Sequence, residues 1–294
     1  MHPHLLNLRL HHWRNYPWLE LACDSRPVIL HGANGAGKTN ILEAISMLAP
    51  GRGLRGVDPQ AVGHHGAMDW QVGAMLAQRE ERYQLGTALS NRRGRLVRID
   101  GNQSSQSALA QLVQIVWLTP AMDRLFNEAP SVRRRFLDRL VMSFDYHHPG
   151  RCAQYEQLAR ERLKLLSGRH QADPLWLDAL EMQMASIIVA IAAARRAFIK
   201  RLNRLRDTVF ARVELIPTGS VEQALEARPA LEVEEILQQS YRESRSKDRQ
   251  AGRTRTASGH GDFQAIDQAS GQKAASCSTG QQKICLIAVI LAYA

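Results

Sequence analysis

The sequence predicts an α/β fold with two lobes, the first built around an antiparallel β meander and the second mainly helical. Three observations support this prediction. Apolar and polar residues alternate over much of residues 6–100, which is the period of a half-buried strand. A glycine-rich turn at residues 32–39 separates an apolar run from an amphipathic segment. From about residue 131 the apolar residues recur with helical spacing.

Length and composition are those of a two-domain globular protein. The chain has 294 residues, and a domain averages ~150 residues. Hydrophobic residues make up 45% and charged residues 22%, which excludes a disordered tail, a collagen-like chain and a small disulfide scaffold. Lysine and arginine number 38 against 28 acidic residues, so the net charge is +10. Nucleic acid or an anionic membrane surface is therefore an expected partner, beside the alternative of a generic basic enzyme.

The cysteines and histidines form no metal-site pattern. None of the four cysteines belongs to a C-x-x-C pair; they are Cys23, Cys152, Cys277 and Cys285. Adjacent side chains point to different faces of a helix or strand, so no histidine doublet is expected to converge on one metal. The doublets are His11-His12, His64-His65 and His147-His148. We expect reduced cysteines and a cytoplasmic location.

No segment predicts export or a membrane span. The N-terminus has no basic region followed by an apolar stretch, so no signal peptide is expected. The longest apolar run, at residues 284–294, is too short to cross a bilayer.

Alternation and turn residues place the elements of the first lobe. Strands are predicted at residues 6–10, 19–21, 28–30, 70–76, 82–89, 95–100 and 112–118. A helix is predicted from Thr39 to about Leu48, followed by a loop at 51–68.

Helical spacing governs the second lobe. Helices are predicted at residues 131–145, 155–165 and 175–212. Residues 240–262 are polar and basic with little periodicity, and the segment from Ser278 opens a strongly apolar helix or strand. We place the two lobes at residues 1–125 and 126–294.

The sharpest motif is a phosphate-binding loop that fits G-x-x-x-x-G-K-[ST] at every fixed position. Its residues are Gly32, Ala33, Asn34, Gly35, Ala36, Gly37, Lys38 and Thr39. The glycines let successive backbone N–H groups point into one concavity, and the following helix N-terminus adds positive potential. Lys38 supplies a charge for the β- and γ-phosphates of ATP, and the Thr39 hydroxyl is suited to ligate Mg²⁺. Kinases, GTPases and transport or repair ATPases share this loop.

A second motif opens the last apolar segment. Ser278, Gly280 and Gln281 fit S-x-G-Q, about 240 residues after the phosphate loop. Ser278 and Gln281 also suit a capping box, which is the structural alternative. In ATP-binding-cassette proteins this signature meets the γ-phosphate of ATP held by the other subunit. The two motifs together predict a P-loop ABC/SMC-like ATPase lobe.

The order of the motifs resembles that of the RecF family of bacterial recombination mediators, which are related to SMC-type ATPases. The matching segments are 13–16, 34–45, Pro130 with 133–138, and 278–283. The family has Phe-Arg-Asn-Tyr where this chain has Trp-Arg-Asn-Tyr. The Arg-Asn-Tyr and Arg-Arg-Phe-Leu-Asp elements separate the RecF family from transporter cassettes.

The resemblance implies an ATP- and Mg²⁺-dependent homodimer, in which one subunit's phosphate loop faces the other's signature. It also implies DNA binding, recombinational DNA repair and replication restart at single-strand gaps, with RecO and RecR as partners. It places Arg14 near the nucleotide; the alternative role for Arg14 is that of a hairpin-turn residue.

Basic clusters are the candidates for the DNA contact. These candidates are Arg133, Arg134, Arg196, Lys200 and Arg204, and a further cluster comprises Arg92, Arg93, Arg95 and Arg98. Such residues would neutralise phosphates and give a salt-dependent, sequence-independent affinity. A solvated helix face is the alternative, and Arg133 and Arg134 are partly structural if Phe136 and Leu137 pack inward.

Two departures from the family pattern affect these expectations. Residues 258–263 lack the proline and arginine that the family carries before the signature. No Walker B pattern, an apolar run followed by Asp and an acidic residue, occurs in the sequence. We therefore expect an incomplete chain with negligible ATP hydrolysis. The rival hypotheses are a non-hydrolysing DNA-binding remnant of a decayed gene and an unrelated P-loop ATPase, such as a transporter subunit.

Overall fold

The computed structural model describes residues 3–90, 94–168, 173–205, 212–254 and 261–293. The chain divides into two compact units, Met1–Trp117 and Leu118–Ala294, which we call the N-terminal and C-terminal units. This division lies ahead of the boundary at residue 125 that the sequence suggested. The reason is local, since a 3₁₀ segment at Pro120–Asn127 packs against the last helix of the C-terminal unit.

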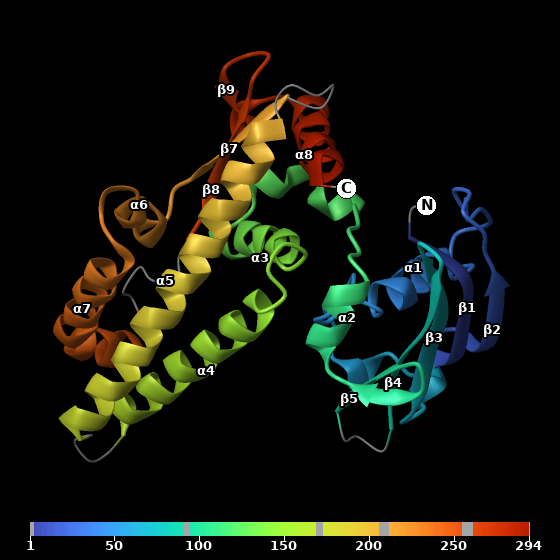
Figure 1. Ribbon diagram of the computed structural model, residues 1–294, viewed down its shortest axis with the longest axis horizontal. Helices are drawn as coiled ribbons and strands as arrows, with labels where there is room; N and C mark the ends of the chain where they lie inside the picture. The colour runs from blue at the N-terminus through green and yellow to red at the C-terminus, as the bar shows by residue number, and fades with distance from the viewer. Residues whose placement is uncertain (1–2, 91–93, 169–172, 206–211, 255–260, 294) are drawn as a thin grey trace. The chain divides into compact units, whose positions relative to one another are not determined.

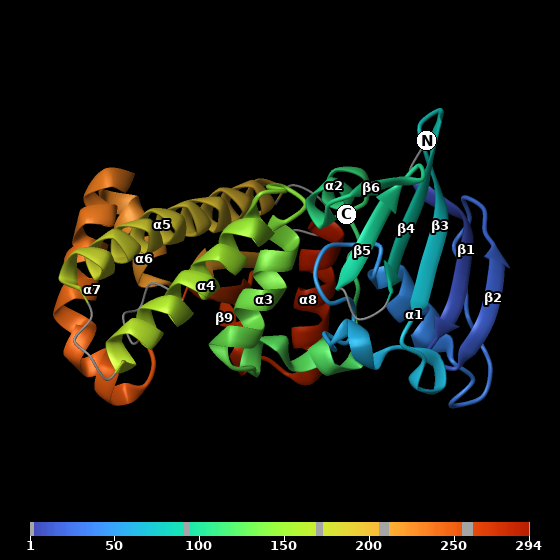
Figure 2. The same ribbon diagram turned by 90° about the horizontal axis from the view of Figure 1, so that it is seen from below.

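A six-stranded antiparallel sheet forms the N-terminal unit. Its strands are β1 (His4–Trp13), β2 (Tyr16–Ala22), β3 (Trp70–Gln78), β4 (Glu81–Leu89), β5 (Arg95–Ile99) and β6 (Asn102–Ser104). Figure 2 shows them side by side, in the order β2-β1-β3-β4-β5-β6. The predicted β meander is therefore confirmed, and β6 is an additional short strand after β5.

Alternation places one face of this sheet in the core. In β3 the side chains of Trp70, Val72, Ala74 and Leu76 are buried, while the residues between them are more exposed. The helix α1 (Lys38–Ser46) packs on this core through apolar residues, as its predicted amphipathic spacing requires. Each fully buried aliphatic side chain stabilises the fold by about 1.5–3 kcal/mol.

Two predicted strands of the N-terminal unit are wrong. Residues 28–30 form no strand: Val28 is 56% exposed and Ile29 is 84% exposed, and no neighbouring strand among the described residues pairs with them. Leu112 instead ends the helix α2 (Gln106–Leu112), because the Ser105 hydroxyl accepts a hydrogen bond from the Ala108 amide and caps that helix. An apolar run becomes a strand only where a partner strand accepts its backbone hydrogen bonds.

Helices dominate the C-terminal unit, shown in green to red in Figure 1. They are α3 (Pro130–Val141), α4 (His148–Ser167), α5 (Pro174–Arg204), α6 (Ser220–Ala227), α7 (Ala230–Ala251) and α8 (Thr279–Tyr293). A small sheet accompanies them, with the strand order β7 (Val213–Pro217), β8 (Phe263–Asp267) and β9 (Gln272–Lys273). Sequence reasoning did not anticipate this sheet.

The helix α5 is the central element of the C-terminal unit. Its apolar face, including Met184, Ala185, Ile188 and Ala192, forms one core cluster with residues of α4, α6 and α7. By length and composition alone α5 could cross a membrane, but half of its apolar window is buried inside the protein. Burial in a core explains the apolar composition of such a helix without a membrane.

Two predictions about helices need correction. The long helix ends at Arg204 rather than at residue 212, and residues 206–211 lie outside the described part of the chain. The polar segment beginning at residue 240 is helical, because α7 continues to Ala251. Its second half is fixed by ion pairs rather than by an apolar stripe, which is why hydrophobic periodicity missed it.

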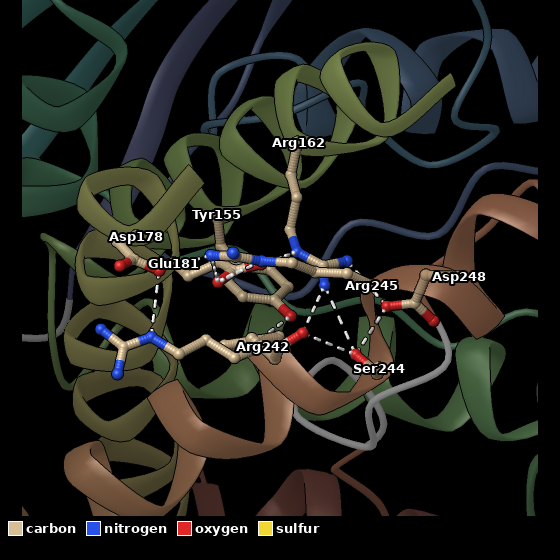
Figure 3. A network of polar contacts seen from close by, with 9 residues as sticks. Tyr155, Arg162, Asp178, Glu181, Arg242, Ser244, Arg245 and Asp248 are labelled. Atoms are coloured by element: carbon tan, nitrogen blue, oxygen red, sulfur yellow. Dashed lines mark hydrogen bonds and ion pairs between the residues drawn. The ribbon is translucent and has the colours of Figure 1, made fainter. Parts of the chain in front are cut away.

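A buried ionic network joins α4, α5 and α7 (Figure 3). The Arg162 side chain is fully buried, and its guanidinium donates to Glu181 Oε1 at 2.8 Å and to Asp248 Oδ2 at 2.7 Å. It also donates to the Tyr241 carbonyl oxygen at 2.8 Å. Arg245 contributes a second guanidinium to Glu181. These hydrogen bonds replace the bonds to water that the Glu181 and Asp248 carboxylates lose on burial.

We predict that Arg162→Met destabilises the protein by roughly 3–5 kcal/mol, because Asp248 and Glu181 lose a buried partner. Urea unfolding at neutral pH measures this loss. The matched control on the same helix is Arg160→Met, whose ion pair with Glu156 is exposed and is expected to contribute under ~1 kcal/mol. Equal losses for the two variants would contradict the assigned role of Arg162.

Candidate nucleotide-binding site

The phosphate loop has the backbone that the motif requires. Gly32, Gly35 and Gly37 all have positive φ, at 143°, 84° and 92°, and such values favour glycine over residues with a side chain. Gly37 also precedes α1, and no side chain caps the N-terminus of that helix. The first amides of α1 therefore have no side-chain acceptor and are suited to receive phosphate oxygens.

Lys38 spans the loop from its position at the start of α1. Its Nζ atom donates to the carbonyl oxygens of Gly32 and Ala33, both at 2.8 Å. An ammonium group carries three protons, so one further donor remains for a phosphate oxygen. Thr39 follows on the first turn with an exposed side chain. The structure thus brings together the predicted residues from Gly32 to Thr39.

The turn between β1 and β2 braces this loop. Trp13 Nε1 donates to the carbonyl oxygen of Asn40 at 2.8 Å, and the Asn40 side-chain amide donates to Asn15 Oδ1 at 2.7 Å. The Tyr16 hydroxyl donates to the carbonyl oxygen of Ala36 at 3.2 Å. Three hydrogen bonds thus connect the hairpin turn to the phosphate loop and to α1.

The close approach of this turn explains why residue 37 is glycine. A β-carbon at Gly37 would lie 2.6 Å from Asn15 Nδ2 and 2.8 Å from Tyr16 Cζ, closer than real side-chain contacts allow. Gly35 has a similar φ, but a β-carbon there meets nothing within 4 Å. Position 37 therefore requires glycine for two reasons, its positive φ and the close approach of the hairpin turn.

Arg14 makes the strongest contact between the turn and α1. Its Nε and Nη2 atoms donate to the two carboxylate oxygens of Glu43, at 2.9 and 2.6 Å, in a bidentate pair. The Glu43 side chain is 1% exposed, and Arg55 also donates to it at 3.0 Å. Arg14 has a positive φ of 53° in the turn. Its guanidinium is thus directed to Glu43 on α1, and a role for Arg14 near the nucleotide stays a prediction.

The signature residues begin α8 in the C-terminal unit. Gln281 Oε1 accepts hydrogen bonds from the Ser278 amide at 2.9 Å and from the Ser278 hydroxyl at 3.0 Å. The Gln281 amide donates to Ser278 Oγ at 3.4 Å. This is the predicted capping box. Gly280 has open space where a β-carbon would be, so the helix N-terminus is accessible to a ligand.

Comparison with known proteins decides the family. No family model matches the chain. The "DNA replication and repair protein RecF" of Mesorhizobium japonicum is 38% identical over 301 residues, covering 99% of this chain and 79% of the relative. The protein of that name from Caulobacter vibrioides is 39% identical over 307 residues, covering 99% of this chain and 79% of the relative. The chain belongs to the RecF family.

Solved structures share the fold. The recombination mediator protein RecF with ATPrS, described as part of the RecFOR pathway, superposes with a TM-score of 0.88 at 19% identity, covering 99% of this chain and 80% of that chain. An Smc head domain from Pyrococcus furiosus has a TM-score of 0.50 at 14% identity, covering 99% and 79%. The predicted ABC/SMC-like ATPase fold is therefore confirmed. The relatives do not favour a decayed remnant or a transporter ATPase.

The Arg-Arg-Phe-Leu-Asp element of the RecF family is largely internal here. Phe136 and Leu137 are each 2% exposed, as the structural alternative required. Arg133 Nε donates to Asp262 Oδ1 at 2.8 Å, and its Nη1 donates to two backbone carbonyl oxygens. Arg134 is half-buried and donates to the carbonyl oxygen of Gly261 at 3.4 Å. Arg133 is thus held by internal bonds, and its contact with DNA stays a prediction.

Asp138, which ends this element, anchors α3 to α5. Its two oxygens accept from Arg195 Nε at 2.8 Å and Nη2 at 3.0 Å, and His148 Nε2 lies 2.8 Å from Oδ1. Burial acts to raise the pKa of Asp138, but the hydrogen bonds from His148 and Arg195 outweigh it and leave the pKa below its ordinary value. Asp138 therefore stays charged and holds Arg195 inside the unit.

The predicted basic cluster of Arg92, Arg93, Arg95 and Arg98 contains both inward-facing and exposed side chains. Arg95 is turned inward, where it donates to Thr87 Oγ1 at 2.7 Å and to the backbone carbonyl oxygens of Gly51, Met47 and Ala49. Desolvation lowers the pKa of Arg95 to about 10. Arg98 is exposed, and Arg92 and Arg93 lie outside the described residues.

The segment that departs from the RecF pattern is described from Gly261 onward, whereas residues 255–260 lie outside the described part of the chain. Gly261 packs so closely on Arg195 and Glu222 that a β-carbon would collide with both. The Asp262 carboxylate forms an ion pair with the Arg133 guanidinium. Sequence reasoning did not assign a role to these residues, because a single aspartate after a glycine matches no known motif.

The four cysteines are free thiols, as predicted. Burial raises the pKa of Cys152 to about 12 and that of Cys285 to about 11. A thiol with a raised pKa is a poor nucleophile, so these two cysteines have no place in the chemistry of the site.

Proposed function

We propose that this chain binds ATP at the loop from Gly32 to Thr39 and acts in DNA replication and repair, the role that its RecF relatives carry in their name. One observation supports the ATP site above all: the phosphate loop has three positive-φ glycines and is bound by the Arg-Asn-Tyr turn through the Tyr16 hydroxyl. The solved RecF structures with ATP and ATPrS support the same ligand.

Each residue of the loop has a distinct role in this proposal. The amides that start α1 donate to the phosphates, and Lys38 adds a charge to the β/γ region. The Thr39 hydroxyl would ligate Mg²⁺, which accepts oxygen donors and keeps several waters. Its exposed position on the first turn of α1 fits that role. When bound, the ion would neutralise charge on the phosphates.

Assembly and partners are further parts of the proposal. Ser278, Gly280 and Gln281 would contact ATP held by a second copy of the chain, since their capped helix start offers amides and a hydroxyl. RecO and RecR would be the partner proteins, and the location would be cytoplasmic. The RecFOR pathway named for the solved RecF structures supports the choice of partners.

The Lys38→Ala variant tests the ATP site. We expect ATP affinity to fall at least about tenfold, the equivalent of ~1.4 kcal/mol, because the variant loses the one charge placed in the loop. Fluorescent-nucleotide titration measures the dissociation constant, and circular dichroism confirms that the variant is folded. Equal affinities for the wild type and Lys38→Ala would refute the proposal.

DNA contact is proposed for one face of α5. Arg196, Lys200 and Arg204 recur at every fourth residue and line a groove of about 900 Å³ with residues of β7 and α6. Arg196 is partly engaged by Glu226 at 3.9 Å. Within the described part of the chain, Lys200 and Arg204 form no ion pair and are exposed. Of the five candidates, these two are best suited to neutralise phosphates.

The double variant Lys200→Ala, Arg204→Ala tests this contact. Because each lost phosphate contact reduces the salt slope of duplex binding by ~0.9, we expect a reduction of about 2 and weaker binding to all sequences. Fluorescence anisotropy against a labelled duplex at several salt concentrations provides the slope. Arg160→Ala is the control, since it removes an exposed cation from α4. A slope unchanged in the double variant, or equally reduced in the control, would rule out this face.

A further inference from the structure

The histidine doublet at the end of β1 does not obey strand alternation. His12 has a φ of +48°, in the left-handed region, so the strand twists out of its pleat between the two residues. As a result the His11 and His12 rings lie on the same side and stack, with their centroids 3.9 Å apart and their planes at 29°. The expectation that adjacent histidines point to different faces is wrong here, because the backbone is not extended at His12.

A carboxylate completes the cluster from the neighbouring strand. His11 pairs with Gln71 in β3, and Asp69 lies just before the start of that strand. His12 Nδ1 lies 3.3 Å from Asp69 Oδ1. A ring nitrogen from each histidine and an oxygen of Asp69 all lie within 4.8 Å of one another. Three ligands of two types, imidazole and carboxylate, therefore converge from β1 and from the residue just before β3.

The His11 ring also has a nitrogen without a hydrogen-bond partner among the described residues. This nitrogen is Nδ1, and it is buried. A buried polar nitrogen without a partner is unfavourable, and rotation of the ring toward a ligand would relieve it. The His12 and Asp69 side chains remain accessible to solvent, at 37% and 53% exposed, so an ion has a route to the cluster.

We propose that His11, His12 and Asp69 form a binding site for a zinc ion, with water in the remaining position. Two imidazole nitrogens and a carboxylate oxygen are ligands that Zn²⁺ accepts, at about 2.0–2.2 Å each. Magnesium and calcium prefer oxygen ligands throughout, so this site selects a transition-metal cation and differs from the Mg²⁺ position at Thr39. The ligand atoms lie within 4.8 Å of one another, and rotation of the solvent-accessible His12 and Asp69 side chains would bring them closer.

A second cluster in the C-terminal unit is the less suitable one. Asp138, His148 and Cys152 also lie within 4.8 Å of one another. However, both oxygens of Asp138 are already bound by the Arg195 guanidinium, and that positive charge opposes a cation. The two clusters predict different effects of substitution, which makes them distinguishable.

Zinc titration of the untagged full chain tests the proposal, with competition against a chromophoric zinc indicator as the readout. We expect one zinc per chain in the wild type and at least a tenfold loss of zinc affinity in both His12→Asn and Asp69→Asn. Asparagine tolerates a positive φ, so His12→Asn preserves the backbone, and circular dichroism checks the fold. Zinc should also raise the midpoint of thermal unfolding of the wild type but not of these variants.

Two control variants complete the experiment. His65→Asn alters another doublet, whose rings lie 4.0 Å apart and whose second residue also has positive φ. Cys152→Ser removes a ligand of the second cluster. Both controls should bind zinc like the wild type. The proposal is overturned if the wild type binds no zinc, if His12→Asn and Asp69→Asn bind it normally, or if either control loses it.

Discussion

The bidentate pair between Arg14 and Glu43 is the contact on which the nucleotide site depends. Glu43 is almost fully buried on α1, and Arg14 occupies a strained position in the β1–β2 turn. The pair fixes the turn against α1, and the turn in turn places Asn15 and Tyr16 against Gly37. The phosphate loop is thus held between a sheet hairpin and a helix rather than by its own residues alone. This arrangement gives a physical reason for the Arg-Asn-Tyr element of the RecF family.

The basic composition of the chain has two separate explanations. Arg95, Arg133, Arg162 and Arg195 are directed inward, where they bind carboxylates or backbone carbonyl oxygens. These bonds set the packing of the sheet edge and the helices. The exposed cations on α5 form a smaller set. The net charge of +10 already counts the paired carboxylates, so the inward ion pairs leave it unchanged and reduce only the number of arginines that can face DNA.

Local patterns in the sequence predicted the features that depend on local chemistry. The phosphate loop, α1, the strands from β1 to β5 and the capping box at Ser278 all follow from residue types at fixed spacing. Features that depend on distant partners were missed. Residues 28–30 have the composition of a strand but lack one beside them among the described residues, and the second half of α7 is ordered by Arg162 and Arg245 through carboxylates.

The direction of single side chains was the least predictable feature. The sequence could place Arg14 near the nucleotide or in a turn, and only the structure shows the carboxylate of Glu43 that accepts its guanidinium. The histidine doublet at His11 escaped prediction for a similar reason, since one residue with positive φ reversed the expected alternation. Backbone exceptions of this kind are set by neighbouring elements rather than by the residues themselves.

Arg14 is expected to act on ATP binding through Glu43 and α1. ATP dissociation constants of Arg14→Met, Glu43→Gln and the double variant test it most directly, with Arg55→Met as the control for the other arginine on Glu43. Both single variants should weaken ATP binding by about fivefold or more, and the double variant should be no worse than either, because all three break one interaction. If Glu43→Gln kept or improved ATP affinity while Arg14→Met lost it, Arg14 would act on the nucleotide itself and not through Glu43.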